Sequence, residues 1–133
     1  MSQENVEILR RMYEAANGGD WESMLREYAH PDCEARFVAG PWGAGTHRGR
    51  EAILAAISDV TAGFDAWIVE PEEFFEAEDR IVVIVRNRLR PKGTDAEFEY
   101  RNGQIWTFRD GKIQSLLQYP SPEETLEAAG LRE

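Results

Sequence analysis

Apolar and polar residues alternate with a period of two through residues 97–119, and this pattern predicts two long antiparallel strands. Asp110 and Gly111 stand between them, and both residue types tolerate the positive φ that a short hairpin turn requires. One face of the first strand carries Phe98, Tyr100, Asn102, Gln104, Trp106 and Phe108. Buried amides need hydrogen-bond partners, so amides between aromatic rings indicate a face that lines a cavity rather than a plain core.

The first half of the chain follows the helical period instead. Apolar residues three and four apart predict amphipathic helices from Ser2 to Asn17, from Asp20 to about His30, and from Arg50 to about Ala62. Glycines follow the first and third helices, and a proline stops the second. Three helices are therefore expected before the main run of strands.

A short strand over residues 32–38 and a glycine-rich loop over residues 40–49 separate the second and third helices. The loop lacks the Gly-Lys-Ser/Thr ending of a phosphate-binding loop. We expect it to form a lip over the cavity mouth that carries Trp42 and His47. Imidazole exchanges protons readily near neutral pH, so His47 is a candidate general base.

After the third helix the pattern predicts strands over residues 66–70, 74–77 and 81–90, followed by the long hairpin. A capping box over residues 121–124 then opens a short terminal helix. Helices followed by an antiparallel meander indicate an α+β fold with the helices gathered on one face of the sheet. No linker or repeat interrupts the chain, so we expect a single domain over residues 1–133.

The strand over residues 81–90 is apolar on both faces at its start. Helices cover one face of the predicted sheet, and an apolar face left on the other side usually meets a second subunit. We therefore expect a homodimer through the outer face of the sheet.

A formal net charge of −10 excludes the classes of protein that bind phosphate-rich partners. Nucleic acids and anionic membrane surfaces are both recognised by clustered Lys and Arg, so neither is an expected partner. The charge favours a cytoplasmic protein. Cys33 is the only cysteine, and neither histidine has metal-ligand spacing, so no metal or other cofactor is expected.

Four segments resemble the SnoaL-like domain proteins, relatives of the polyketide cyclases within the nuclear-transport-factor-2-like superfamily. These segments are MYEAANGGDWESMLREYAHPDCEARF, THRGREAILAAI, AEDRIVVIVRNRLR and QIWTFRDGKIQSLLQYPSPEETLEAAGL. The resemblance implies a cone-shaped fold, with N-terminal helices in the concave face of a strongly curved, mostly antiparallel sheet and a short C-terminal helix. It also implies a pocket at the open end of the cone.

The resemblance further implies which residues bind a substrate in that pocket. With the loop tryptophan added, this expected set is Trp42, Ile84, Phe98, Tyr100, Asn102, Gln104, Trp106, Leu116 and Gln118. Isomerases of the superfamily place carboxylates at two positions that fall here near Arg36 or Phe37 and at Gln104. Since neither position is acidic, an isomerase mechanism does not transfer directly.

The resemblance places Arg86 on the inward face of the sheet. Two interpretations of this residue are open. Its guanidinium offers forked donors that would hold an oxyanion, or it forms a structural ion pair with an acidic side chain. On the first interpretation Tyr13 or His47 moves the proton in a cofactor-independent cyclase, isomerase or hydratase reaction on an apolar carbonyl or enolisable compound. The alternative function is a non-catalytic ligand-binding or dimeric scaffold protein of the same fold.

Overall fold

The structure is a computed structural model that describes residues 2–38, 44–77 and 79–131. Its helices are α1 (Ser2–Asn17), α2 (Trp21–Tyr28), α3 (Arg50–Thr61) and α4 (Pro122–Ala128). Its strands are β1 (Ala29–Phe37), β2 (Gly45–Arg48), β3 (Phe64–Ala77), β4 (Arg80–Pro91), β5 (Phe98–Arg109) and β6 (Lys112–Tyr119). The predicted α+β fold class is confirmed.

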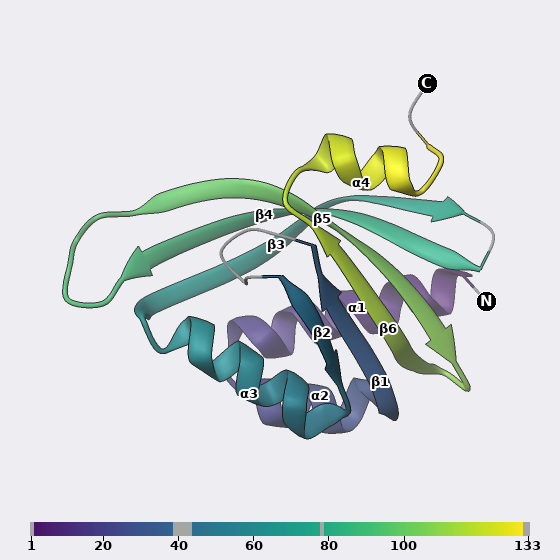
Figure 1. Ribbon diagram of the computed structural model, residues 1–133, viewed down its shortest axis with the longest axis horizontal. Coiled ribbons are helices and arrows are strands. Elements are labelled where there is room, and N and C mark those ends of the chain that lie inside the picture. The colour runs from purple at the N-terminus through teal and green to yellow at the C-terminus, as the bar shows by residue number, and fades with distance from the viewer. Residues whose placement is uncertain (1, 39–43, 78, 132–133) are drawn as a thin grey trace.

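The six strands form one curved sheet in the order β2-β1-β6-β5-β4-β3. Only the pair of β1 and β6 among these neighbours is parallel, and the others are antiparallel. Helices α1, α2 and α3 lie against the concave face, whereas α4 lies over the opposite, outer face (Figure 1). The sheet therefore has a helix-covered inner face and a partly covered outer face.

The hairpin between β5 and β6 turns as the sequence predicted. Asp110 and Gly111 adopt φ values of 54° and 76°, and Arg109 pairs with Lys112 across the turn. Two consecutive positive φ values are typical of a type I′ turn, whose twist matches that of the flanking strands. The turn sets the pairing of Phe108 with Ile113, and a register shift between Thr107 and Phe108 then places Gln104 opposite Gln118.

Three expected boundaries differ from the structure. Strand β1 begins at Ala29, directly after α2, so His30 and Pro31 lie in the strand rather than before it. His47 lies in strand β2 instead of a loop, because residues 45–48 pair with the edge of β1. The two short strands expected between residues 66 and 77 are one strand, β3. A register shift at Pro71 lets β3 continue past a residue that has no N–H to donate, as bulged edge strands allow.

The end of α1 is attached to β3 by one side chain. The Asn17 amide donates to the Val69 carbonyl and accepts from the Val69 N–H, at 2.8 Å in both hydrogen bonds. The amide thus makes, at a single residue, the two backbone hydrogen bonds that a neighbouring strand would make. This attachment holds the last turn of α1 against the concave face.

A second, smaller apolar cluster lies on the outer face under α4. Val82 and Ile105 of the sheet pack there against Ala129. Gly103 provides the close approach, because a Cβ built at this position would stand 2.0 Å from Thr125 Oγ1. Helix α4 therefore covers part of the apolar outer face that suggested a dimer, and the homodimer stays a prediction.

Candidate functional site

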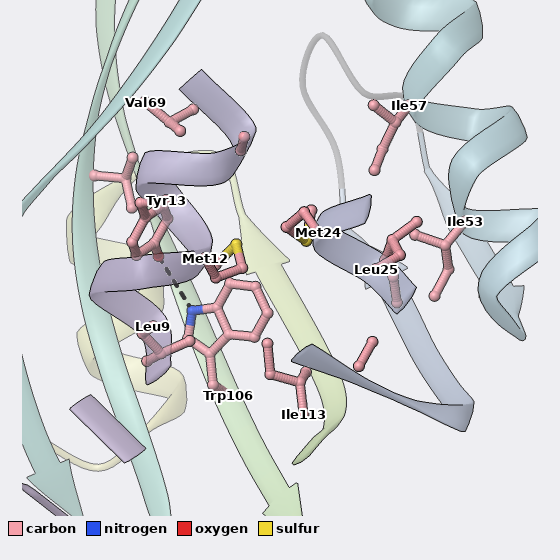
Figure 2. Packing of buried hydrophobic residues seen from close by; sticks show 14 of the residues in the cluster. Leu9, Met12, Tyr13, Met24, Leu25, Ile53, Ile57, Val69, Trp106 and Ile113 are labelled. Atoms are coloured by element: carbon pink, nitrogen blue, oxygen red, sulfur yellow. Dashed lines mark hydrogen bonds between the residues drawn. The ribbon is translucent and has the colours of Figure 1, made fainter. Parts of the chain in front are cut away.

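A cavity of about 90 Å³ lies between the three N-terminal helices and the concave face of the sheet. The helices contribute Met12, Tyr13, Trp21, Met24, Ile53 and Ile57, among others, to its lining. Figure 2 shows Tyr13 and Trp106 on one side of this region and Met24, Leu25, Ile53 and Ile57 on the side of α2 and α3. The cavity is therefore mainly apolar and lies at the centre of the larger core.

Five of the residues expected in the site line this cavity together. They are Tyr13, Gln104, Trp106, Leu116 and Gln118. Their positions follow from one face of the β5–β6 hairpin and from the single helical residue, Tyr13, that faces it. Tyr13, Gln104 and Gln118 thus form the polar wall of the cavity.

A chain of hydrogen bonds runs along this polar wall. The Trp106 indole Nε1–H donates to the Tyr13 hydroxyl at 3.3 Å, drawn as the dashed line in Figure 2. The Tyr13 hydroxyl donates to Gln104 Oε1, and Gln104 Nε2 donates to Gln118 Oε1 at 2.8 Å. All four side chains are buried, with between 3% and 8% of each residue exposed. Both amide oxygens and the nitrogen of Gln104 therefore have hydrogen-bond partners within the chain.

A second chain of the same kind lies beside it on β4 and β5. The Trp67 indole N–H donates to Asn87 Oδ1 at 3.1 Å, and Asn87 Nδ2 donates to Asn102 Oδ1 at 3.1 Å. Asn87 lines the cavity and Asn102 is buried behind it. Tyr100 packs against the edge of the main core on the same face of β5.

Burial controls the two cavity groups that carry a dissociable proton. Removal from water raises the pKa of the Tyr13 phenol far above its ordinary range, although the hydrogen bond from Trp106 acts in the opposite direction. Burial also raises the pKa of the Cys33 thiol, against the opposing effect of the Arg50 charge. Both groups are therefore neutral at physiological pH, and Tyr13 keeps the proton that it donates to Gln104.

Charge reaches the cavity at one described residue. Glu34 is the only charged side chain among the described lining residues, and it pairs with Arg48 at 2.9 Å. His47 pairs with Ala35 in the sheet, and its ring centroid lies 5.7 Å from that of Phe37. Since Ala35 and Phe37 both line the cavity, His47 lies beside its wall but is not part of the lining.

Arg86 and Ile84 lie on the outer face of β4, opposite to the expected side. The register pairs Val83 with Gln104, so the odd-numbered residues of β4 share the cavity face. Arg86 instead forms an ion pair with Glu99, and 40% of its side chain is exposed. The expected placement of Arg86 and Ile84 in the pocket is thus corrected, because β4 turns its uncharged face to the helices.

Two further expected residues lie away from the cavity or outside the described part of the chain. Phe98 shares the inner face of β5 but stands near its far end, with 54% of the residue exposed. Trp42 falls within residues 39–43, which the structure does not describe.

Asn87 is the polar cavity residue that sequence analysis did not identify as part of the site. The signal for it was present, since Asn87 follows Ile81, Val83 and Val85 on one face of its strand. An amide within an apolar stripe indicates a cavity face for the same reason as Asn102 and Gln104 do.

None of the described helices combines the length and apolar character that crossing a lipid bilayer demands. Within the described ranges, His, Cys, Asp and Glu side chains form no group of three or more that would hold a metal ion.

Known structures share this architecture over nearly the whole chain. TerC, crystallised with polyporic acid, is 25% identical, with a TM-score of 0.76 and coverage of 96% of this chain and 98% of TerC. An NTF2-like protein from Burkholderia xenovorans is 30% identical, with a TM-score of 0.69 and coverage of 96% and 95%. A SnoaL-like polyketide cyclase homologue from Jannaschia is 19% identical, with a TM-score of 0.74 and coverage of 98% and 94%, and shows a likeness of fold.

No curated protein matches the sequence. The family that describes the chain is the SnoaL-like domain, whose pattern matches residues 9–116. That match runs from the middle of α1 through most of β6 and includes the cavity wall up to Leu116. This chain belongs to the SnoaL-like domain family.

Proposed function

We propose that this protein binds a small, largely apolar molecule in the cavity between its N-terminal helices and its sheet. The observation that carries the proposal is the composition of the cavity wall, in which mainly apolar side chains surround a small set of ordered amides. Binding sites for small molecules usually combine an apolar surface with a few oriented polar groups. The co-crystal of TerC with polyporic acid supports the same use of the fold in a relative.

The volume of the cavity limits the size of the ligand. About 90 Å³ is less than the volume of roughly 150 Å³ in an engineered cavity that binds benzene. Even a ligand of one ring must therefore displace side chains or extend toward the cavity mouth. Met12 and Met24 line the cavity, and their unbranched side chains move more readily than branched ones.

A titration with acetophenone, followed by the backbone and indole amide resonances of the ¹⁵N-labelled protein, tests this proposal. We expect shifts concentrated at the cavity, including the indole N–H of Trp106 and of Trp21. Ala35→Leu fills the cavity from β1 and should abolish those shifts, because Ala35 is a buried lining residue. Ala96→Leu makes the same change at an exposed loop position and should leave binding intact.

Two results would count against the binding function. One is the absence of saturable shifts at any acetophenone concentration. The other is binding that persists unchanged in a folded Ala35→Leu variant, since the ligand would then occupy another place.

A second candidate function is a cofactor-independent cyclase, isomerase or hydratase reaction on an apolar carbonyl or enolisable compound. The observation that favours it is the position of His47 beside Phe37, together with the Glu34 carboxylate at the cavity lining. In this reaction His47 or Glu34 removes a proton from the bound compound. Tyr13 is a less suitable proton carrier, because burial favours its neutral form and its hydroxyl proton is engaged with Gln104.

Proton exchange distinguishes catalysis from binding alone. An enolising enzyme would speed replacement of the methyl protons of acetophenone by deuterium in D₂O, measured as loss of the methyl signal by ¹H NMR. His47→Asn and Glu34→Gln would each be tested for loss of that acceleration. An exchange rate equal to that of buffer would leave binding as the function of the cavity.

We also propose that the protein forms a homodimer through the outer face of the sheet. The support is the alternation of charge on β3, β4 and β5, where Glu70, Glu72 and Glu99 alternate with three arginines. A surface with both signs interspersed is able to match a second copy of itself around a two-fold axis. The cytoplasmic location expected from the net charge likewise stays a prediction.

A further inference from the structure

The two hydrogen-bond chains of the cavity wall each begin at a tryptophan. An indole N–H is a donor only, so it cannot accept a hydrogen bond from the next group in the chain. Trp106 donates to the Tyr13 hydroxyl, and Trp67 donates to Asn87 Oδ1. The indole therefore favours one direction for the later hydrogen bonds, because the group that accepts from it keeps its own donor free for the next group.

The direction of the first chain passes through three further side chains. Tyr13 accepts from Trp106 and uses its own proton toward Gln104, which must therefore present its carbonyl oxygen. The nitrogen of the Gln104 amide then faces Gln118, whose oxygen accepts. Each amide thus has its oxygen toward the tryptophan and its nitrogen away from it.

Gln118 is the end of this chain, and its nitrogen is left as a donor. Only 3% of the residue is exposed, and it lines the cavity. No hydrogen bond between described residues uses its Nε2. A buried donor without a protein partner is costly, so the cavity favours an occupant that supplies an acceptor.

The second chain makes the same side of the cavity rich in donors. Asn87 uses its oxygen for Trp67 and one N–H for Asn102, and its remaining N–H belongs to a residue of the cavity lining. The described lining residues include no Lys, Arg or His, and their one charged side chain is the carboxylate of Glu34. An anionic ligand would therefore find amide donors but no positive charge, and a neutral acceptor fits better.

We infer that the cavity selects a neutral ligand that presents an acceptor oxygen, such as a ketone or another carbonyl compound, to the side-chain amide N–H of Gln118. Trp106 acts as a positioning residue, because its indole N–H sets the polarity of the chain that ends at Gln118. This inference rests on the proposed binding function and adds the chemical class of the ligand and the residue that recognises it.

The test compares two probes of nearly the same shape. Acetophenone carries a carbonyl oxygen, and α-methylstyrene has a methylene group in its place. We expect acetophenone to bind about tenfold more tightly, as one additional hydrogen bond in a buried site implies. The dissociation constants come from the NMR titration, in which the Gln118 side-chain amide resonances should shift with acetophenone only.

Variants identify the residue responsible for the discrimination. Gln118→Leu should bring the ratio of the two dissociation constants close to one, whereas Gln114→Leu makes the same change on β6 outside the cavity and should preserve it. Trp106→Phe should lower the ratio as well, because the amide chain is then free to reverse. The ratio separates this effect from lost packing, which weakens both probes.

Each outcome has a distinct meaning. Equal affinity of the two probes for the wild type would overturn the inference and leave the binding function in place. Discrimination that survives in Gln118→Leu would overturn the role of Gln118, and if that variant does not fold, the wild-type Gln118 amide shifts decide the same point. Absence of binding by either probe would overturn the proposed function and this inference together.

Discussion

The hydroxyl of Tyr13 accepts a hydrogen bond from Trp106 and donates one to Gln104 inside an apolar core. A phenol in this position does two things for the molecule. It transmits the direction of the hydrogen-bond chain, and it avoids leaving two buried polar groups without a partner. Its contribution to stability is therefore separable from its effect on the ligand.

Tyr13→Phe should lower the free energy of unfolding by about 1–3 kcal/mol near pH 7, because it leaves Gln104 Oε1 and the Trp106 N–H unpaired. The difference in unfolding free energy between the wild type and Tyr13→Phe should narrow above about pH 10. Burial raises the folded-state pKa of Tyr13 above its unfolded value, so only the unfolded state loses this proton as the pH rises through 10. The stability from this group is thus complete below pH 10 and is lost above it.

Urea denaturation of the wild type and Tyr13→Phe from pH 8 to pH 11 measures this difference. Its change with pH should approach about 1.4 kcal/mol per pH unit above the unfolded pKa. Other tyrosines and lysines titrate equally in both proteins, so they cancel in the comparison. Two stability curves that stay parallel over the whole range would show that Tyr13 ionises as easily in the folded state as in the unfolded one.

Arg86 illustrates the opposite case, a residue with suitable chemistry on the wrong face for the cavity. Arg86→Met should leave acetophenone affinity within twofold of the wild type, because the guanidinium pairs with Glu99 on the outer face. Its thermal unfolding midpoint should stay close to that of the wild type, as expected for a partly exposed ion pair. Calorimetric titration and thermal unfolding of the same sample check both values. Loss of binding in a stably folded Arg86→Met protein would show that this arginine takes part in ligand binding.

At the scale of elements, the contact between α4 and β5 depends on the absence of one side chain. A Cβ at Gly103 would overlap Thr125, which belongs to α4 and is fully buried between the helix and the sheet. Helix and sheet packed this closely leave no flexible atom to give way. Ser121 is the N-cap of this helix, because its hydroxyl accepts a hydrogen bond from the Glu124 N–H.

Gly103→Ala should destabilise the protein by about 1–3 kcal/mol, because α4 must move to relieve the overlap. Hydrogen exchange should show the loss mainly in α4, and urea denaturation gives its size. Gly18→Ala is a matched control, since the nearest atom to its Cβ would lie at an ordinary 3.4 Å. The double variant Gly103→Ala/Thr125→Gly tests the cause. If its loss of unfolding free energy equals the sum of the losses in the two single variants, the contact between these residues is not responsible.

For the whole molecule, the outer face of the sheet decides whether the proposed dimer forms. Arg101 pairs there with Glu72 at 2.7 Å, near the pair of Arg86 and Glu99. Since α4 already covers the apolar cluster around Val82, charge matching has a larger part in the proposed interface than apolar contact.

Sedimentation velocity should show a dimer for the wild type and a monomer for Arg101→Glu, which adds a carboxylate beside Glu72 and Glu99. Arg11→Glu changes the net charge equally but lies on α1, and it should remain dimeric. Circular dichroism verifies that each variant is folded. A wild-type protein that sediments as a monomer at every concentration would exclude the dimer.

Local sequence patterns determined most of the elements of this protein. The helical period, the terminal capping box and the Asp-Gly turn each act through the backbone of neighbouring residues, so their effects are visible in a short stretch of chain. The amides of β5 also indicated a cavity face, because one face of that strand carries aromatic and amide groups while the other face carries charged residues on either side of Gly103. Tyr13, Gln104, Trp106, Leu116 and Gln118 were located in this way and by family resemblance.

Tertiary structure alone decided which face of β4 meets the helices. Its first half is apolar on both sides, so a period of two shows that there are two faces and does not distinguish between them. Pairing with β5 and burial against the helices chose the face of Val83, Val85 and Asn87, which avoids placing Arg86 in the core. The sequence by itself therefore determined the elements and one wall of the cavity. The long-range pairing of strands decided the other wall, because burial free energy depends on what each face finally contacts.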